Sequence, residues 1–208
     1  MATGSYVEER DDWLSAVERA RGERWRLLEL TAIADPLLGT LEPFLAESGA
    51  LLDEFERVSL HAPIRFDSSE TISETILNLP LEGDVIFHPD TWGEEHAPDR
   101  LGTRVVFENM DIGKPFGRSV NDLRSVFAEH PEAGFCLDVA HVWTNDRSLR
   151  LGHDLIDAFG GRLRQLHVSG IDPDGTHRTT TQTDIELYRP LLERCADVPW
   201  ILEAVIET

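Results

Sequence analysis

The sequence predicts an α/β fold built on parallel strands, and three observations lead to this prediction. Short apolar runs recur along the chain, with little of the alternation that marks a sheet exposed on one face. Segments with helical periodicity lie between most of these runs, and the connections are short. Eight such runs in 208 residues leave about 26 residues per unit, close to the minimum for a closed (β/α)8 barrel. The predicted architecture is therefore a compact barrel that forms a single domain over residues 1–208.

The strand candidates are recognised by their apolar content and by the polar or ionisable residue that ends each of them. The first is only the remnant of a strand, whereas the other seven are full apolar runs. In chain order the eight candidates are 2–6, 26–32, 57–64, 84–89, 104–109, 134–139, 163–168 and 199–205.

The helix candidates fill most of the intervals between the strands. They cover 11–21, 36–55, 69–79, 120–130, 148–159 and 184–195. Start signals support several of them, such as Asp35 followed by Pro36 and Glu70 in the first turn of its segment.

Two helices of a complete barrel are predicted to be missing. The segment 90–103 is too rich in Gly, Pro and Asp for a good helix, so the fourth helix is expected to be a loop. The chain ends three residues after the last strand candidate, which leaves no eighth helix to cover it. A bare flank would expose apolar surface, and this predicts either a homodimer or a capping contact from the N-terminal segment.

The charge balance restricts the class of partner. Asp and Glu number 39 against 19 Lys and Arg, a formal net charge of −20, and Lys114 is the only lysine. Nucleic-acid binding proteins carry a basic surface, so a nucleic-acid partner is not expected, and neither is an anionic membrane. The sequence has no apolar run of about 20 residues and no signal-peptide pattern. Cys136 and Cys195 lie far apart, which favours a reducing, cytoplasmic location.

Ionisable side chains stand at or near the carboxyl end of six strand candidates. They are His61, His88, Glu108, Asp138, His167 and Glu203. In a parallel barrel these ends all lie at one rim, where barrel enzymes place their active sites. His141 follows Asp138 by three residues and can turn back toward the same rim. His177 lies in the loop after the seventh strand.

Imidazoles and carboxylates at one rim form a ligand set for a borderline divalent metal. Zinc, manganese, cobalt or ferrous iron fits this set better than calcium, and between one and three ions are expected. A single histidine at a strand end is more often a hydrogen-bonded core residue, and Glu108 alone could form a salt bridge. Carboxylates are rarely buried without a partner, however, so six such strand ends together favour a shared metal centre.

Three other histidines are expected to have no part in this centre. His96 lies in an acidic loop, and His130 and His153 lie on predicted helices. Solvated surface positions are expected for all three.

The motifs SLHAP, IFHPD, VFENMD, CLDVAH, QLHVSG and ILEAV occur in this order, each at a strand end. Their order and spacing resemble the xylose-isomerase-like TIM barrels, a superfamily that includes endonuclease IV and many sugar isomerases and epimerases. The resemblance runs from about Tyr6 to the end of the chain. It implies one metal ion held by the residues that match the isomerase ligands, Glu108, Asp138, His167 and Glu203.

The resemblance to endonuclease IV implies further metal ligands. Its additional zinc-binding histidines match His61, His88 and His141. Endonuclease IV has an Asp-x-His pair after strand seven, whereas here two residues separate Asp174 from His177. The resemblance thus implies a second metal site and leaves the third open.

Two reactions fit this constellation. In a sugar isomerase or epimerase, Glu108 and Glu203 would move a proton through an enediolate while the metal polarises the substrate. In a multi-metal phosphodiesterase of the endonuclease IV type, two or three ions bridged by Glu108 would activate a water. The acidic surface favours the first reaction, with a small molecule, most simply a carbohydrate, as substrate. An iron-dependent oxidase or peptide-modifying enzyme, and a scaffold without catalysis, are further alternatives.

The catalytic and substrate-binding candidates complete the hypothesis. Glu108, Glu203 and His141 are the catalytic candidates. Trp92, Trp143 and Phe116 follow strands and could wall the pocket. Arg178 or Arg118 could bind an anionic group of the substrate.

Overall fold

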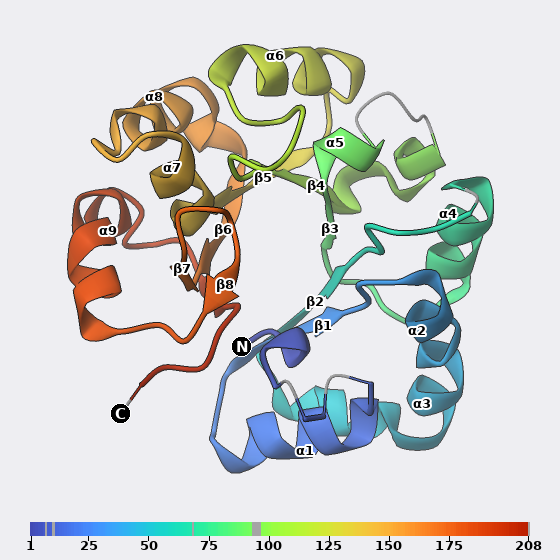
Figure 1. Ribbon diagram of the computed structural model, residues 1–208. Helices are drawn as coiled ribbons and strands as arrows, with labels where there is room; N and C mark the ends of the chain where they lie inside the picture. The colour runs from blue at the N-terminus through green and yellow to red at the C-terminus, as the bar shows by residue number, and fades with distance from the viewer. Residues whose placement is uncertain (7, 10, 68, 93–96, 208) are drawn as a thin grey trace.

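Seven parallel strands surround the axis of a barrel in the computed structural model, which describes residues 1–6, 8–9, 11–67, 69–92 and 97–207. The strands are β1 (Leu27–Thr31), β2 (Arg57–His61), β3 (Val85–Phe87), β4 (Val105–Glu108), β5 (Gly134–Asp138), β6 (Leu163–Val168) and β9 (Trp200–Leu202). Each pairs in parallel with the next in this order, and the helices form an outer ring around them (Figure 1). The predicted α/β barrel is confirmed.

The first two residues close the gap between β9 and β1. The backbone N–H of Ala2 donates to the carbonyl oxygen of Leu202, and that of Glu29 donates to Met1, both at 2.9 Å. Ala2 forms a parallel bridge with Glu29, so residues 1–2 stand where an eighth strand belongs.

The predicted strand 2–6 is wrong beyond Ala2. Thr3–Ser5 forms a 3-10 helix (η1), because the N–H groups of Ser5 and Tyr6 donate back to Ala2 and Thr3 instead of to a neighbouring strand. Met1 and Tyr6 are buried against the core, so this segment packs on the flank where no eighth helix lies. Figure 1 shows both chain ends in this interval between α9 and α1.

Most of the helices lie between the strands where the periodicity predicts them. The helices are α1 (Trp13–Gly22), α2 (Asp35–Gly39), α3 (Leu41–Ser48), η2 (Gly49–Glu54), α4 (Ser69–Asn78), α5 (Pro89–Trp92), η3 (Ala97–Arg104), α6 (Val120–Glu129), α7 (Val139–Asn145), α8 (Arg150–Phe159), η4 (Gly160–Arg162) and α9 (Gln182–Arg194). Capping boxes begin α6 and α9, with Ser119–Asp122 and Thr181–Asp184 exchanging hydrogen bonds. The sequence analysis missed α7, which carries His141.

The fourth and eighth helices are short or absent, as predicted. Between β3 and β4 the described residues form only the four-residue α5 and the 3-10 helix η3. After β9 the described chain forms no helix, and Ile206 makes a single bridge with Thr180. None of the helices in the described ranges is long and apolar enough to cross a bilayer.

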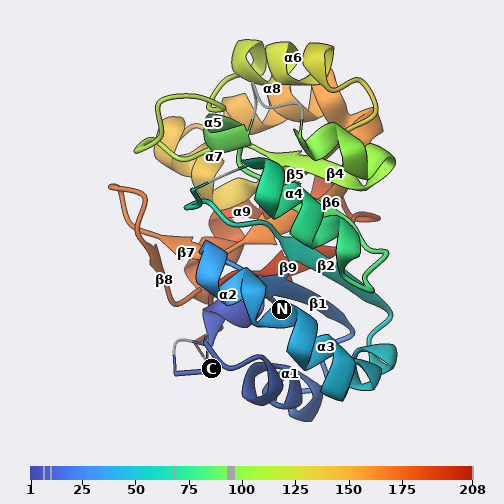
Figure 2. The same ribbon diagram turned by 90° about the vertical axis from the view of Figure 1, so that its right-hand side faces the viewer.

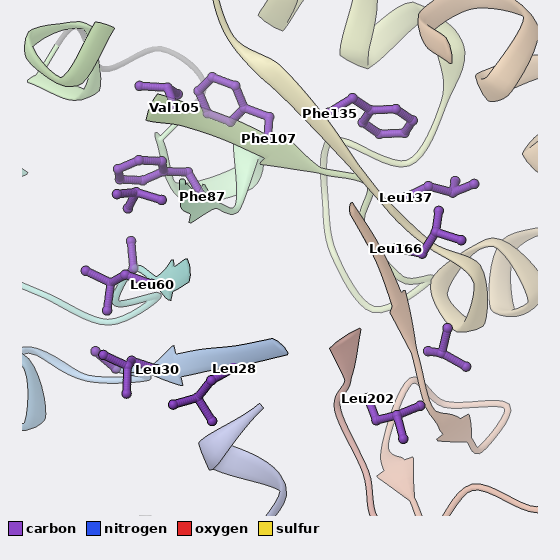
Figure 3. Close-up of a cluster of buried hydrophobic side chains, with 14 of the residues drawn as sticks. Leu28, Leu30, Leu60, Phe87, Val105, Phe107, Phe135, Leu137, Leu166 and Leu202 are labelled. Atoms are coloured by element: carbon purple, nitrogen blue, oxygen red, sulfur yellow. The ribbon is translucent and has the colours of Figure 1, made fainter. Parts of the chain in front are cut away.

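Alternation along the strands separates two environments. Residues such as Leu28, Leu30, Phe107 and Phe135 face outward and pack under the helices, as the close-up in Figure 3 shows. Their neighbours along each strand have the opposite parity and face the barrel interior, where Ile86, Val106 and Cys136 form a separate small cluster. The last residues of several strands also point into the barrel. Their side chains place the candidate site at the carboxyl end of the barrel.

Candidate metal centre

All eight predicted ligands converge at this carboxyl end. His61, Glu108, Asp138 and His167 occupy inward positions on β2, β4, β5 and β6. His88 and Glu203 follow β3 and β9 directly, and His141 lies in the first turn of α7. The eighth, His177, begins β8 (His177–Arg178), which pairs with β7 (Gly170–Ile171) in a hairpin that projects from the barrel (Figure 2). Their nitrogen and oxygen atoms form three adjoining groups.

The first group, here called the His61 group, consists of His61, His88 and Glu108. The Nε2 atoms of the two histidines lie 3.2 Å apart. Each also lies 3.5 Å from Oε2 of Glu108. These three atoms form a nearly equilateral triangle.

The second group, here called the central group, consists of Glu108, Asp138, His167 and Glu203. Nδ1 of His167 lies 3.3 Å from Oε1 of Glu108 and 3.1 Å from Oε1 of Glu203. Because Glu108 offers Oε2 to the His61 group and Oε1 to the central group, its carboxylate connects the two.

The third group, here called the His177 group, consists of Asp138, His141 and His177. The Nε2 atoms of the two histidines lie 3.2 Å apart. The hairpin turn brings His177 there, and Gly175 is required in it, since a Cβ at its positive φ would lie 2.6 Å from Oδ1 of Asp111. Asp174 is not part of the group, because its carboxylate accepts the N–H of Thr176 within the turn.

Backbone carbonyls fix which nitrogen of two histidines faces these groups. Nδ1–H of His61 donates to the carbonyl oxygen of Ala62 at 2.9 Å, and Nδ1–H of His141 donates to that of Asn109 at 2.8 Å. A carbonyl can only accept, so in the neutral form of each ring the lone pair lies on Nε2, the atom in the donor group. Hydrogen bonds of this kind orient metal-binding histidines in proteins.

The donor atoms fit divalent metal ions. Two ligand atoms of a tetrahedral zinc ion lie about 3.3–3.4 Å apart when each bond is about 2.0–2.1 Å long. Separations of 3.1–3.5 Å within the His61 and central groups match this spacing. Among the described residues, both oxygens of Glu108, Oδ2 of Asp138 and Nδ1 of His167 are buried without a hydrogen-bond partner. Such atoms cost stability unless something binds them, and cations held by the adjoining groups would satisfy them.

The electrostatics of the metal-free site agree with a cation-binding role. Burial alone would raise the pKa of Glu108, but the charge of His167 and the close contacts of the surrounding imidazoles hold the pKa well below its usual value. Burial would lower the pKa of His141, yet the charges of Asp138 and Glu108 outweigh it and raise the pKa to about 10. Without a metal, protons on His141 and His167 compensate the buried carboxylates, because the pKa of each ring is raised.

Comparison with known proteins identifies the fold. The structure is similar to that of a xylose isomerase domain protein from Alicyclobacillus acidocaldarius subsp. acidocaldarius, with a TM-score of 0.58 over 94% of this chain and 85% of that chain. The chain has the xylose-isomerase-like barrel fold. Sequence identity between the two is 16%. No protein-family profile and no curated protein matches the sequence.

A cavity of about 310 Å³ opens onto the donor groups of this xylose-isomerase-like barrel. Six donors line it, namely His61, His88, Glu108, His141, His177 and Glu203. The remaining wall includes Ile33, Ile64, Asp111 and Lys114. Nζ of Lys114, the only lysine in the sequence, lies 3.4 Å from Oδ2 of Asp90. A second cavity, of about 530 Å³, lies beside Arg57 and Gly83 near the other end of the barrel and contains none of the donors.

The two tryptophans predicted to contact the substrate do not line this cavity. Trp92 is fully buried between Phe66 and Phe87, and its Nε1–H donates to Pro63. Trp143 packs under the guanidinium of Arg147. Neither tryptophan lines the cavity, because each packs against its own neighbours.

The predicted anion-binding arginines also lie elsewhere. Arg178 forms two hydrogen bonds to Asp184, and Nε of Arg118 donates to Asn145. Neither arginine lines the cavity, nor does Phe116. The cation that does line it is Lys114.

One of the surface histidines was also predicted wrongly. His130 is 2% exposed and contacts Asp99 and the ring of Phe107. His153 is half-buried beside Arg194, and His96 lies outside the described residues. The apolar neighbours on β4 explain why His130 is buried at the end of its helix.

Sequence reasoning missed the carboxylate that supports the central group. Glu29 lies on β1 and is 0% exposed, with Oε2 2.7 Å from Nε2 of Gln165 and 3.2 Å from Nε2 of His167. The hydroxyl of Ser59 donates to the same oxygen at 3.1 Å. The sequence does contain a signal for this contact. Glu29 lies between two leucines of a strand that face outward, so the alternation of side chains points Glu29 into the barrel.

Proposed function

We propose that this chain is a metal-dependent enzyme in which two or three divalent ions act together at the rim of the barrel. The observation that carries the proposal is the position of Glu108, whose two oxygens face different imidazoles. Oε2 lies 3.5 Å from Nε2 of His61 and from Nε2 of His88, and Oε1 lies 3.3 Å from Nδ1 of His167. A carboxylate placed in this way would bridge two adjacent cation sites.

Hydrolysis of a phosphoester is the reaction that this arrangement supports best. Divalent ions, when bound, would supply Lewis acidity toward a phosphoryl oxygen and lower the pKa of water. Both oxygens of Glu108 lie 3.3–3.5 Å from imidazole nitrogens, which favours a ligand role for this residue over proton transfer with a substrate carbon. Its function in the proposal is to hold the cation sites at a fixed separation.

The cavity supports a small anionic substrate. A volume of about 310 Å³ suits a small molecule, and the lysine in its wall is the feature that would recognise a phosphate or carboxylate. The net charge of −20 opposes a duplex nucleic acid, which would approach through a repulsive field. The substrate class proposed is therefore a small phosphate ester, with a sugar phosphate as its simplest member.

A sugar isomerase or epimerase is the second candidate, and a specific observation favours it. The central group alone supplies a Glu–Asp–His–Glu set sufficient for one ion. Glu203 lines the cavity and is only partly occupied, since its Oε2 lies 3.8 Å from Nδ1 of His177. In this reaction Glu203 and Glu108 would exchange a proton with the substrate.

Metal content and a matched pair of variants distinguish the two reactions. The purified protein is analysed for zinc, manganese, cobalt and iron, and then assayed with phosphomonoesters, phosphodiesters, aldoses and ketoses, with and without chelator. We expect two or more ions per chain and phosphoester cleavage that the chelator abolishes. Iron as the native metal, with oxygen consumption, would instead identify the oxidase alternative.

The decisive variant is His88→Ala, which removes one ligand from the His61 group and leaves the central group complete. Phosphoester hydrolysis is expected to fall at least about 100-fold, since a cation site is lost. Isomerase activity would need only the central group and would persist. The matched control is His153→Ala, which removes a half-buried histidine far from the donors. Full hydrolysis by the His88 variant would overturn the proposal.

A further inference from the structure

Glu29 contacts the central group from inside the barrel, although it is not one of the donors. Its side chain is 0% exposed. Nε2 of His167 lies 3.2 Å from Oε2 of Glu29, on the side of the ring opposite the central group. The other ring nitrogen, Nδ1, is the atom that faces Glu108 and Glu203.

Gln165 competes for the same nitrogen of His167. Its Nε2 lies 2.7 Å from Oε2 of Glu29 and 2.8 Å from Nε2 of His167. An amide oxygen at this position would face the Glu29 carboxylate with no proton between them, so the amide nitrogen belongs there. This NH2 group has two hydrogens, and one of them can donate to His167 when Nε2 carries a lone pair.

The two partners favour opposite tautomers. If Nε2 of His167 accepts from Gln165, the proton lies on Nδ1 and the lone pair faces away from the central group. If Nε2–H donates to Glu29, the lone pair lies on Nδ1 and faces the central group. A carboxylate is the stronger hydrogen-bond partner because it carries a charge.

We propose that Glu29 is a positioning residue that holds His167 in the metal-binding tautomer against the amide of Gln165. The inference rests on the proposed metal-dependent function and concerns the ligand orientation on which that function depends. Partners of this kind change metal affinity by about 10–100-fold when they are removed. Glu29 therefore controls how tightly the central group binds its ion.

The test measures Zn²⁺ affinity, by competition with a chromophoric chelator, and the His167 tautomer, by NMR of histidine labelled with ¹⁵N. Glu29→Leu is expected to weaken the tightest Zn²⁺ site about 10–100-fold and, in the neutral His167 ring, to move the proton from Nε2 to Nδ1. Glu29→Gln keeps the shape and lacks the charge, so it is expected to fold in any case and to weaken the site about tenfold. His167→Asn assigns the NMR signals by their loss.

A rescue separates positioning from a structural contribution. Glu29→Leu combined with Gln165→Leu removes both partners, and affinity is expected to recover at least about threefold over Glu29→Leu alone. The matched control is Ser59→Ala, which removes another hydrogen bond to Oε2 of Glu29 and leaves the tautomer unaffected. Unchanged Zn²⁺ affinity in both Glu29 variants would overturn the inference, as would a double variant no better than the single. A wild-type protein that takes up no metal would overturn the proposed function as well, whereas failure of the inference alone leaves wild-type binding intact.

Discussion

Both ends of the barrel contain carboxylates surrounded by basic side chains. The basic side chains are arginines at the amino end and histidines at the carboxyl end. At the amino end, Asp84 accepts from two arginines, Arg164 at 2.8 Å and Arg57, and Arg57 also donates to the backbone of residue 164. At the carboxyl end, Glu108 is surrounded by imidazoles and both of its oxygens lack a hydrogen bond within the described residues. Guanidinium groups always carry their protons, whereas imidazoles can offer lone pairs. The protein itself therefore supplies the partners of Asp84 at the amino end. The partners of Glu108 at the carboxyl end are supplied in full only when cations bind.

The largest expected effect of this difference is at Glu108. Glu108→Gln replaces an oxygen by an amide NH2 that cannot bind a cation, in a side chain shared by two groups. Activity is expected to fall by about 1,000-fold or more, and the metal content by at least one ion per chain. Elemental analysis and turnover measured on the same preparation check both results. Wild-type metal content in this variant would remove Glu108 from the bridge position.

The matching change at the amino end is Asp84→Asn. Two arginines then lose a charged partner in a half-buried setting, since Asp84 is 14% exposed and the arginines about one third. The free energy of unfolding is expected to fall by about 2 kcal/mol, with metal content and turnover unchanged. Urea unfolding of the metal-loaded protein measures the first, and elemental analysis the second. Loss of metal from this variant would contradict the separation of the two ends.

A third prediction concerns pH, because the pKa of His141 is about 10 in the metal-free fold. This value lies above that of an unfolded histidine, about 6.5, so the stabilisation is fully present below about pH 6.5. It is lost as the pH rises through about 10. Metal-free protein is thus expected to unfold more readily at pH 9 than at pH 6.5. The metal-loaded protein lacks this trend, because its imidazoles are already deprotonated.

The proton on His141 also competes with the metal ion for the donor groups. Between pH 6.5 and 8.5 apparent Zn²⁺ affinity is expected to rise about tenfold per pH unit for each proton displaced from the site. Competition titrations in buffers of equal ionic strength measure it, with His141→Gln as the variant that lowers the slope. An affinity independent of pH over this range would show that the site binds Zn²⁺ without losing a proton.

The sequence predicted the eight donors but not the contacts that support them, and the reason is physical. Strand-end position follows from the apolar runs, so His61, Glu108, Asp138 and His167 could be placed at one rim. The missed Glu29 lies in the middle of a strand, where its distance to His167 depends on how the barrel closes. The tryptophans were predicted to wall the pocket because each follows a strand. Trp92 instead packs in the core, and Trp143 packs against Arg147.

A fourth prediction concerns Lys114, the cation in the cavity wall. Lys114→Ala is expected to raise KM for an anionic substrate about tenfold, to change kcat little and to leave metal content intact. Lys114→Arg is expected to keep most of the affinity, because it retains the charge. Arg124→Ala on the exposed face of α6 removes a charge far from the cavity and is the control. Equal KM values for wild type and Lys114→Ala would show that the anion is bound by other groups.

The smallest expected effect is at Trp143, which follows β5 near the donors but does not line the cavity. Its ring lies 4.4 Å from the guanidinium carbon of Arg147. Trp143→Leu removes this contact, so the free energy of unfolding is expected to fall by about 0.5–1 kcal/mol. KM and kcat are expected to stay within about twofold of wild type, because the ring does not line the cavity. Steady-state kinetics with a substrate found in the assays described above measure both constants, and a KM raised tenfold would place Trp143 in the wall of the pocket.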